Sequence, residues 1–304
     1  MSTLPAVPQP KKPAPPPGLL VVDKPAGMTS HDVVARVRRI MGTRKVGHAG
    51  TLDPMATGVL VLGIERATKL LGHLALDRKT YLATIVLGAA TSTDDAEGEP
   101  LSEADASGVT DDAIAAGIAG LTGEIAQVPS AVSAVKIDGK RAYARVRAGE
   151  TVELAARPVT VYRFDLLATR REGARIELDA VVECSSGTYV RALARDLGAG
   201  LGVGGHLGAL RRTTVGPFTL AAARTLERLE EAPELSYGLD DAVATAFPRR
   251  DVDEAAALAV RHGRRLRPAG LSGTYGVFDP AGTALALAVD EGETARSVVV
   301  LLPA

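Results

Sequence analysis

The stretch K-V-G-H-A-G-T-L-D-P-M-A-T-G, residues 45–58, packs three glycines, one histidine, one aspartate and one proline into fourteen positions. Glycines at this density are typical of backbone that needs positive φ or a close approach by another group. Pro54 fixes φ directly after Asp53, so the stretch predicts a stiff loop that carries a lone carboxylate. Such a carboxylate can act as nucleophile, general base or metal ligand. It can also be an ordinary turn residue, and loop composition by itself favours that simpler interpretation.

The composition around this loop is that of a soluble globular protein, with 46% hydrophobic and 23% charged residues in 304 positions. This length suits one large and one small domain, or two medium ones. The single cysteine, Cys184, excludes an internal disulfide and fits a reducing cytosol. No apolar run approaches the roughly 20 residues that span a bilayer, and the N-terminus lacks the apolar segment of a secretory signal. We therefore expect a cytoplasmic protein with no membrane partner.

Charge is distributed unevenly along the chain, although the net charge is only −1. Residues 18–90 carry ten Lys and Arg against five Asp and Glu, and residues 131–218 carry fourteen against nine. Residues 91–130 hold nine acidic side chains and no basic one. If the two basic segments meet in space, they form a surface suited to phosphates. Solvated charge scattered over helices is the alternative interpretation.

Alternating apolar and polar residues predict strands on both sides of the chain's middle. Residues 80–87 place Tyr81 and three aliphatic side chains on one face, and residues 175–184 alternate apolar with largely acidic side chains. The other predicted segments are helices over 31–41 (capped by Thr29 or Ser30), 67–74, 111–121 and 188–197, a strand over 159–167 and a loop over 88–100. Strand candidates outnumber helices and many links have hairpin length, which favours an α+β fold class over a regular βαβ alternation.

Composition also divides the chain into parts. Residues 1–17 contain seven prolines and predict a disordered or polyproline-II tail. Residues 127–149 mix strand-like and turn residues with five cations, which predicts a basic hairpin or flap. After a boundary near residue 250, short strands and glycine-bearing turns predict a small β-barrel of separate identity.

Several familiar motifs are absent or misleading. Residues 200–205 fit G-x-G-x-x-G, but they follow a predicted helix, and no acidic residue occurs beyond them until Glu227, so dinucleotide binding is not expected. The five histidines lack metal-ligand spacing, and there is no phosphate loop or serine nucleophile elbow. We therefore expect no metal and no cofactor.

Six blocks in fixed order cover residues 18 to about 218. The blocks are G-L-L-V-V-D-K-P-A-G-M-T-S (18–30), K-V-G-H-A-G-T-L-D-P-M-A-T-G-V-L (45–60), K-T-Y-L-A-T-I-V-L-G-A-A-T-S-T-D-D-A-E-G (79–98), Q-V-P-S-A-V-S-A-V-K-I-D-G-K-R-A-Y with A-R-P-V-T-V-Y (127–143 and 156–162), C-S-S-G-T-Y-V-R-A-L-A-R-D-L-G (184–198) and H-L-G-A-L-R-R-T (206–213). In this order the blocks resemble the TruB family, the tRNA uridine-55 pseudouridine synthases.

This resemblance implies a pseudouridine-synthase fold, with a mixed, mainly antiparallel central sheet flanked by helices and a small C-terminal β-rich PUA-like domain. It divides the chain into a catalytic domain at 18–248, with a flap at about 130–158, and a C-terminal domain at 249–304. The implied activity is isomerisation of uridine to pseudouridine in the T-loop of tRNA without a cofactor. The implied partner is the tRNA T-arm, which a monomer would bind without a protein partner.

The resemblance also assigns roles to individual residues. Asp53 would be the nucleophile or base, Arg191 would pair with it, and Tyr81 would stack on the flipped uracil. The remaining implied substrate-binding residues are His48, which fills the gap left by the base, Leu210, an apolar wall of the pocket, Lys24, which with Pro25 buttresses the loop, and Lys136 and Arg147, phosphate contacts in the flap. Arg36, Arg38, Arg39, Arg44 and Lys45 would also contact phosphates.

Two other functions share these features. A tRNA-binding RNA chaperone, with catalysis secondary, would use the same basic segments and flap. A related synthase acting on another RNA would share the chemistry. Covalent attack by Asp53 and proton removal through a glycal both remain open as mechanisms.

Overall fold

The computed structural model describes residues 13–74, 78–130, 136–137, 140–141 and 154–303. Most of the predicted Pro-rich tail (residues 1–12) and Arg147 lie outside these residues. Of the predicted flap, the described part includes two short paired strands, β8 (Lys136–Ile137) and β9 (Lys140–Arg141). Among the described helices, none is both long and apolar enough to cross a membrane.

One large sheet organises the molecule, with strand order β14-β1-β3-β12-β4-β11-β10-β7 and with β2 and β13 attached to β3 and β12. Its strands are β1 (Gly18–Lys24), β2 (Val46–Ala49), β3 (Thr57–Ile64), β4 (Lys79–Leu87), β7 (Gly123–Gln127), β10 (Arg157–Glu172), β11 (Arg175–Cys184), β12 (Gly205–Val215), β13 (Phe218–Thr219) and β14 (Tyr237–Gly238). Only β12 and β3 pair in parallel; the other described pairs of this sheet are antiparallel. The predicted mixed, mainly antiparallel sheet is confirmed.

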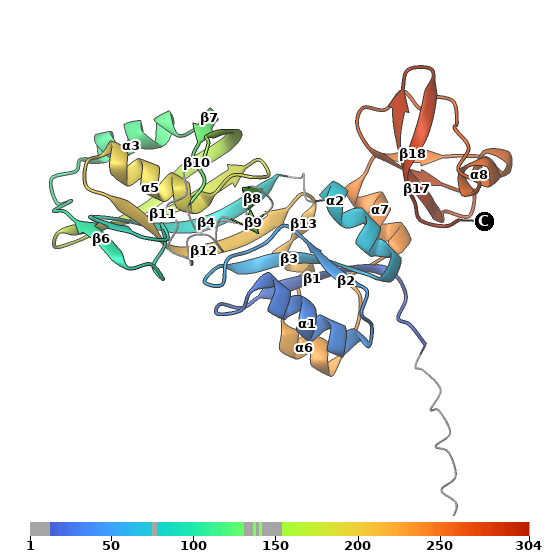
Figure 1. Cartoon of the computed structure of the whole chain (residues 1–304), viewed down its shortest axis with the longest axis horizontal. Coiled ribbons are helices and arrows are strands. Elements are labelled where there is room, and N and C mark those ends of the chain that lie inside the picture. The colour runs from blue at the N-terminus through green and yellow to red at the C-terminus, as the bar shows by residue number, and fades with distance from the viewer. Residues whose placement is uncertain (1–12, 75–77, 131–135, 138–139, 142–153, 304) are drawn as a thin grey trace, which may run out of the picture.

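Helices cover the two ends of the sheet separately (Figure 1). The helices are α1 (Ser30–Met41), α2 (Leu71–Leu74), α3 (Asp111–Gly120), α5 (Val190–Gly200), α6 (Leu226–Glu231), α7 (Leu239–Ala246) and α8 (Glu254–Arg261), with 3₁₀ turns η1 (Glu65–Leu70) and η2 (Leu220–Ala222). Helices α3 and α5 lie over β4, β11 and β10, whereas α1 and α6 lie against β1 and β3. Figure 1 thus shows a sheet of two halves that meet where β3 runs beside β12.

Each half has its own apolar core. Leu193 and Leu197 of α5 pack in one cluster with Ile85 and Ile176 of the sheet. On the other half, Val33 and the other apolar residues of α1 pack against β1 and β3. Each fully buried aliphatic side chain of this size contributes about 1.5–3 kcal/mol to folding. Each half of the sheet is therefore held rigid by its own core, and a site at the joint can take side chains from both halves.

The joint between the halves is very tight at Gly58. Strand β3 pairs with β12 through Thr57↔Arg211 and Gly58↔Arg212 only. Gly58 has φ +100°, and a Cβ at this position would lie 2.1 Å from the carbonyl oxygen of Arg212. A glycine is therefore required here, because any side chain would push β3 and the loop before it away from β12.

Three sequence predictions need correction. Residues 88–100 are not all loop, because β5 (Ala89–Thr91) pairs with β6 (Pro100–Glu103). Strand β10 extends well beyond 159–167, since its polar C-terminal half stays paired with β11 and Arg170 bridges to Glu177 and Asp179 across the ladder. The helix predicted over 188–197 runs from Val190 to Gly200.

One glycine of the G-x-G-x-x-G stretch, Gly205, serves packing between α5 and β12. A Cβ on Gly205 would come within 2.6 Å of the Ala194 carbonyl oxygen, and one on Gly198 within 2.2 Å of the Gly205 backbone nitrogen, so the helix and strand touch through bare backbone. Residues 201–204 form the turn that joins these two elements, and Gly202 and Gly204 have positive φ there. Packing and turn conformation thus account for these three glycines without a bound dinucleotide.

The C-terminal residues form a four-stranded sheet in the order β15-β16-β17-β18, joined by α8. Its strands are β15 (Arg249–Asp251), β16 (Tyr275–Phe278), β17 (Ala284–Glu291) and β18 (Thr294–Val300). Phe278 and Leu287 of this sheet share one buried cluster with Leu70, Leu74 and Val243. The PUA-like barrel and its boundary at residue 249 stay predictions.

Candidate active site

A cavity of about 620 Å³ opens at the joint of the two halves. Its walls come from the start of α1, the loop between β2 and β3, strands β4 and β12, the loop 185–189 and the first turn of α5. Five of the predicted site residues line it, namely His48, Asp53, Tyr81, Arg191 and Leu210. Lys24 lies beneath it; the Lys136 side chain and Arg147 lie outside the described part of the chain.

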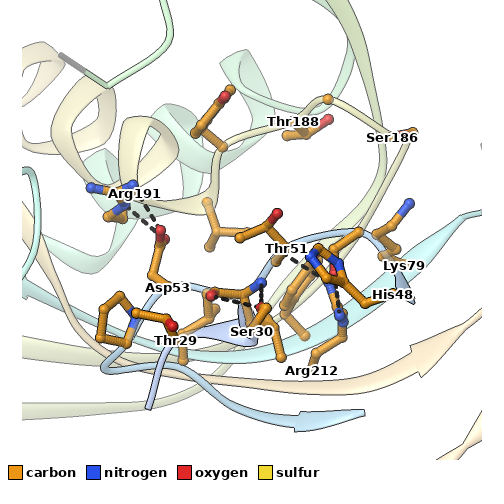
Figure 2. Close-up of a pocket in the computed structure, with 18 of the residues that line it drawn as sticks. Thr29, Ser30, His48, Thr51, Asp53, Lys79, Ser186, Thr188, Arg191 and Arg212 are labelled. Atoms are coloured by element: carbon orange, nitrogen blue, oxygen red, sulfur yellow. Dashed lines mark hydrogen bonds and ion pairs between the residues drawn. The ribbon is translucent and has the colours of Figure 1, made fainter. Parts of the chain in front are cut away.

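Asp53 and Arg191 face each other at one end of the cavity (Figure 2). The guanidinium Nε lies 3.0 Å from Asp53 Oδ2, and Nη2 donates to Oδ1 at 3.1 Å. The Arg191 side chain is only 5% exposed, whereas that of Asp53 is 35% exposed. A two-point pair of this kind fixes the carboxylate plane while leaving part of it open to a ligand.

The pKa of Asp53 is raised above its usual value because burial disfavours the carboxylate form. The Arg191 charge and its hydrogen bond act in the opposite direction, as does Lys24, while the nearby Asp95 raises the pKa further. The ionisation of Asp53 therefore depends on how closely Arg191 is held against it.

A second carboxylate, which sequence reasoning missed, shares Arg191. The guanidinium Nη1 lies 3.3 Å from Asp95 Oδ2 and donates to the Thr93 carbonyl oxygen at 2.9 Å. Asp95 is itself 5% exposed and accepts hydrogen bonds from the Thr93 hydroxyl and the Glu97 amide. The only sequence signal was the pair Asp94-Asp95 within a predicted loop, which does not say which carboxylate turns inward.

Lys24 supports the loop from below. The side chain is fully buried, and its Nζ donates to the carbonyl oxygens of Pro25, Met28 and Pro54 at 2.9, 2.6 and 3.1 Å. Burial lowers the pKa of Lys24 to about 8. Because Pro54 follows Asp53 directly, this ammonium ties the carboxylate-bearing loop to the turn after β1.

Arg212 is the second unpredicted residue of the site. It is fully buried in β12, where Nε donates to the Val59 carbonyl at 2.8 Å and Nη2 to the Gly50 carbonyl at 3.0 Å. It also hydrogen-bonds the Tyr81 side chain. A buried arginine beside the half-exposed Arg211 leaves no sequence signal, since the pair reads as one basic patch.

Two rings and one aliphatic side chain complete the walls. Tyr81 is 7% exposed and Leu210 is 8% exposed, on neighbouring strands β4 and β12. Burial raises the pKa of the Tyr81 hydroxyl, so it stays protonated at neutral pH. The His48 ring meets the edge of His31, with centroids 5.6 Å apart. Burial, and secondarily His31 and Arg212, lower the pKa of His48, which favours its neutral form.

Some of the cations predicted to bind phosphates pair with other residues of this chain. Arg36 pairs with Glu227 and Glu230, and Lys45 pairs with Glu65. Arg38 donates to the Val46 carbonyl oxygen. These contacts stabilise α1 and the strand after it, and phosphate binding by Arg36, Arg38, Arg39, Arg44 and Lys45 stays a prediction.

Comparison with known proteins gives consistent matches along the chain. The model of the TruB family pseudouridylate synthase N-terminal domain matches residues 38–190. Residues 191–244 match the tRNA pseudouridylate synthase B C-terminal domain, and residues 247–302 the tRNA pseudouridine synthase II C-terminal model. The chain is 64% identical over 288 residues to tRNA pseudouridine synthase B of Rhodococcus jostii (strain RHA1), covering 94% of each protein. It is 64% identical over 286 residues to the protein of that name from Nocardia farcinica (strain IFM 10152), again covering 94% of each.

Solved structures agree with these matches. The chain superposes with a TM-score of 0.71 and 28% identity on a chain of a Cbf5-Nop10-Gar1 complex, covering 94% of this chain and 85% of that one. It superposes with a TM-score of 0.70 and 26% identity on a chain of an H/ACA RNP bound to a substrate RNA containing 2'-deoxyuridine, with the same coverages. The predicted fold class is confirmed by these likenesses.

Proposed function

Because this chain belongs to the TruB family of pseudouridylate synthases, we propose that it isomerises uridine to pseudouridine in tRNA, at position 55 of the T-loop. The names of its relatives support tRNA as the substrate. The observation that carries the proposal is the ionic pair of Asp53 and Arg191 at the end of a cavity large enough for one nucleotide. The position of the reacting uridine in the T-loop is a more specific part of this proposal than tRNA as the substrate.

The reaction breaks the N1–C1′ glycosidic bond, turns the uracil and joins its C5 to the ribose C1′. C5 then loses its hydrogen as a proton and N1 gains one, so the product is an isomer of the substrate. In a folded RNA the base and sugar carbon are covered by stacking, so the nucleotide must leave the stack and enter the cavity. The cavity offers a carboxylate at one end and apolar and aromatic walls at Tyr81 and Leu210. These are the surroundings that a flipped pyrimidine requires.

Asp53 supplies the reactive group, either by attack on the nucleotide or by removal of a proton. Both roles require an ionised carboxylate in a site that excludes water when it closes around the base. Arg191 offsets the desolvation of that carboxylate by its two-point contact. The 35% exposed fraction of the Asp53 side chain leaves it accessible to the substrate.

Tyr81 stacks against the flipped uracil, and Leu210 closes the apolar side of the pocket. His48 occupies the space that the base vacates in the RNA. The lowered pKa of His48 favours this role, since a neutral ring enters a base stack without carrying a charge out of water. Lys136 and Arg147, in the segment we propose as a flap, bind the phosphates of the T-arm.

Incubation of the full chain with an unmodified tRNA transcript, followed by mapping of pseudouridine, tests the proposal. We expect a single new pseudouridine, in the T-loop. Asp53→Asn should form none while binding the transcript as tightly as the wild type, and the exposed-loop variant Asp105→Asn should be fully active. Pseudouridine formed by Asp53→Asn at the wild-type rate would remove Asp53 from the mechanism. A wild type that binds and refolds tRNA but forms no pseudouridine would favour the RNA-chaperone function instead.

A further inference from the structure

Helix α5 carries Arg191 in its first turn, yet its start differs from those of α1, α3 and α8. Those helices are capped by the residues before them, Thr29, Thr110 and Asp253, whose side chains accept hydrogen bonds from backbone amides of the first turn. The residue before α5 is Tyr189, whose own side chain makes no capping hydrogen bond in the described structure. The first turn of α5 must therefore be located by a contact from elsewhere in the chain.

That contact comes from Gln127, the last residue of β7. The Tyr189 amide donates to Gln127 Oε1 at 2.8 Å, and Gln127 Nε2 donates to the Tyr189 carbonyl oxygen at 3.1 Å. Only this orientation of the side-chain amide satisfies both contacts, because the flipped orientation would oppose two donors and two acceptors. Gln127 is 2% exposed, so the site is dry and a lost partner would leave a polar group buried.

Gln127 is itself anchored. Its backbone pairs with Arg157 of β10 in the β7–β10 ladder. A second contact joins α5 to the residue after β7, because Arg195 Nη2 of α5 donates to the Val128 carbonyl oxygen at 2.7 Å. The start of α5 is thus tied to the end of β7, which is held in the sheet by its pairing with β10.

Arg191 lies two residues after Tyr189, and its guanidinium meets Asp53 through two atoms at 3.0 and 3.1 Å. A displacement of the first turn by about 1 Å would break one of these contacts, and misplacements of that size can slow catalysis about 100-fold. We propose that Gln127 is a positioning residue for the reaction, which locates Arg191 against Asp53 by holding the Tyr189 peptide. This inference rests on the proposed function.

Two consequences separate positioning from general stability. The first is a slower chemical step with unchanged tRNA affinity, because Gln127 is not among the residues that line the cavity. The second is a shift in pH dependence. The charged groups that act on Asp53 are Arg191 and Lys24, which lower its pKa, and Asp95, which raises it. If Arg191 moves away, the pKa of Asp53 rises. The fall in rate at low pH, which is the acid limb of the pH–rate profile, then moves to higher pH.

The experiment compares the wild-type full chain with Gln127→Leu and Gln127→Glu in single-turnover pseudouridine formation on an unmodified tRNA transcript. We expect Gln127→Leu to be roughly 10- to 100-fold slower, with transcript Kd within about 2-fold of the wild type and an acid limb at higher pH. Gln127→Glu keeps the acceptor for the Tyr189 amide and loses the donor, so it should also be slower, and it serves if Gln127→Leu does not fold. Thr110→Ala, which removes the cap of α3, should lose stability but keep the wild-type rate and pH profile.

A folded Gln127→Leu or Gln127→Glu protein with the wild-type rate and pH profile would overturn the inference. Loss of rate with an unmoved acid limb, matched by Thr110→Ala, would reduce Gln127 to a stabilising residue and also overturn it. Failure of the proposed function has a different signature, because the wild type itself would then form no pseudouridine.

Discussion

The floor and the wall of the cavity each bury cationic side chains, and they use them differently. In the floor, Lys24 and Arg212 donate to backbone carbonyl oxygens of residues 25–28 and 50–59. In the wall, Arg191 meets the carboxylates of Asp53 and Asp95. Carbonyl oxygens carry no titratable charge, so the floor chiefly sets geometry, although Lys24 also lowers the pKa of Asp53. The carboxylates beside Arg191 are titratable, so the wall sets ionisation as well.

This difference divides the work between two sets of residues. Lys24 of β1 and Arg212 of β12 hold the Asp53 loop in place from both sides of the joint. Arg191 of α5 brings the counter-charge. The following substitutions test the division, and we expect the largest effect in the floor.

Arg212→Met should lower the free energy of unfolding by about 3 kcal/mol or more, because buried carbonyl groups lose their donor at about 1–3 kcal/mol each. Chemical denaturation measures this loss. The matched control is Arg211→Met on the next position of β12, whose ion pair with Asp23 is partly exposed (side chains 38% and 27%), so its effect should stay below about 1 kcal/mol. Equal losses in the two variants would contradict the assignment of Arg212 to the floor.

Arg191→Lys should slow single-turnover pseudouridine formation by about 100-fold, since an ammonium cannot make the two-point contact with Asp53. Stability should change less than in Arg212→Met, because the lysine keeps the charge between the two carboxylates. The control is Arg163→Lys, which alters an exposed ion pair with Asp165. A wild-type rate in Arg191→Lys would show that charge alone, without geometry, supports the reaction.

Asp95→Asn should have the smallest effect of the three, roughly a tenfold lower rate, because Arg191 loses a buried ion-pair partner worth about 1.5 kcal/mol. The pH dependence gives the sharper test. Asp95 raises the pKa of Asp53, so its neutralisation should lower that pKa and move the acid limb of the rate to lower pH. Asp94→Asn is the matched control, since Asp94 pairs with Arg195 instead. An acid limb that moves upward would mean that Asp95 acts chiefly by orienting Arg191.

The opposite directions expected for Asp95→Asn and Gln127→Leu sharpen the comparison further. One variant removes a negative charge near Asp53, and the other withdraws a positive one. If neither acid limb moved, the wall would act through geometry alone.

Much of the fold could be read from local pattern. The alternation over residues 80–87 predicted a strand with Tyr81 on its buried face, and β4 has that pattern. The helix from His31 onward followed from an apolar stripe, and of its two predicted cap candidates, Thr29 and Ser30, the structure uses Thr29. These predictions succeeded because side-chain periodicity and helix capping depend on neighbours a few residues away. The start of β5 within a predicted loop was missed, because its pairing with β6 depends on a partner that local pattern does not identify.

The site divides in the same way. Asp53, Tyr81 and Arg191 were predicted as site residues because the family resemblance assigns them roles, whereas Asp95, Arg212 and Gln127 lie in the same sequence blocks without an assigned role. Each of the three missed residues acts through a partner far along the chain: Arg191 for Asp95, Val59 for Arg212 and Tyr189 for Gln127.

By itself, then, the amino-acid sequence indicated the family, a candidate carboxylate and the elements that carry the candidate site residues, since distinctive sequence blocks and local spacing suffice for these. Which of the two neighbouring aspartates turns inward, and which of the two neighbouring arginines is buried, was decided only when β3 paired with β12 and α5 packed over the sheet. Burial and charge pairing arise between segments that are distant in sequence. Their strength depends on separations of a few ångströms, which the tertiary structure alone sets.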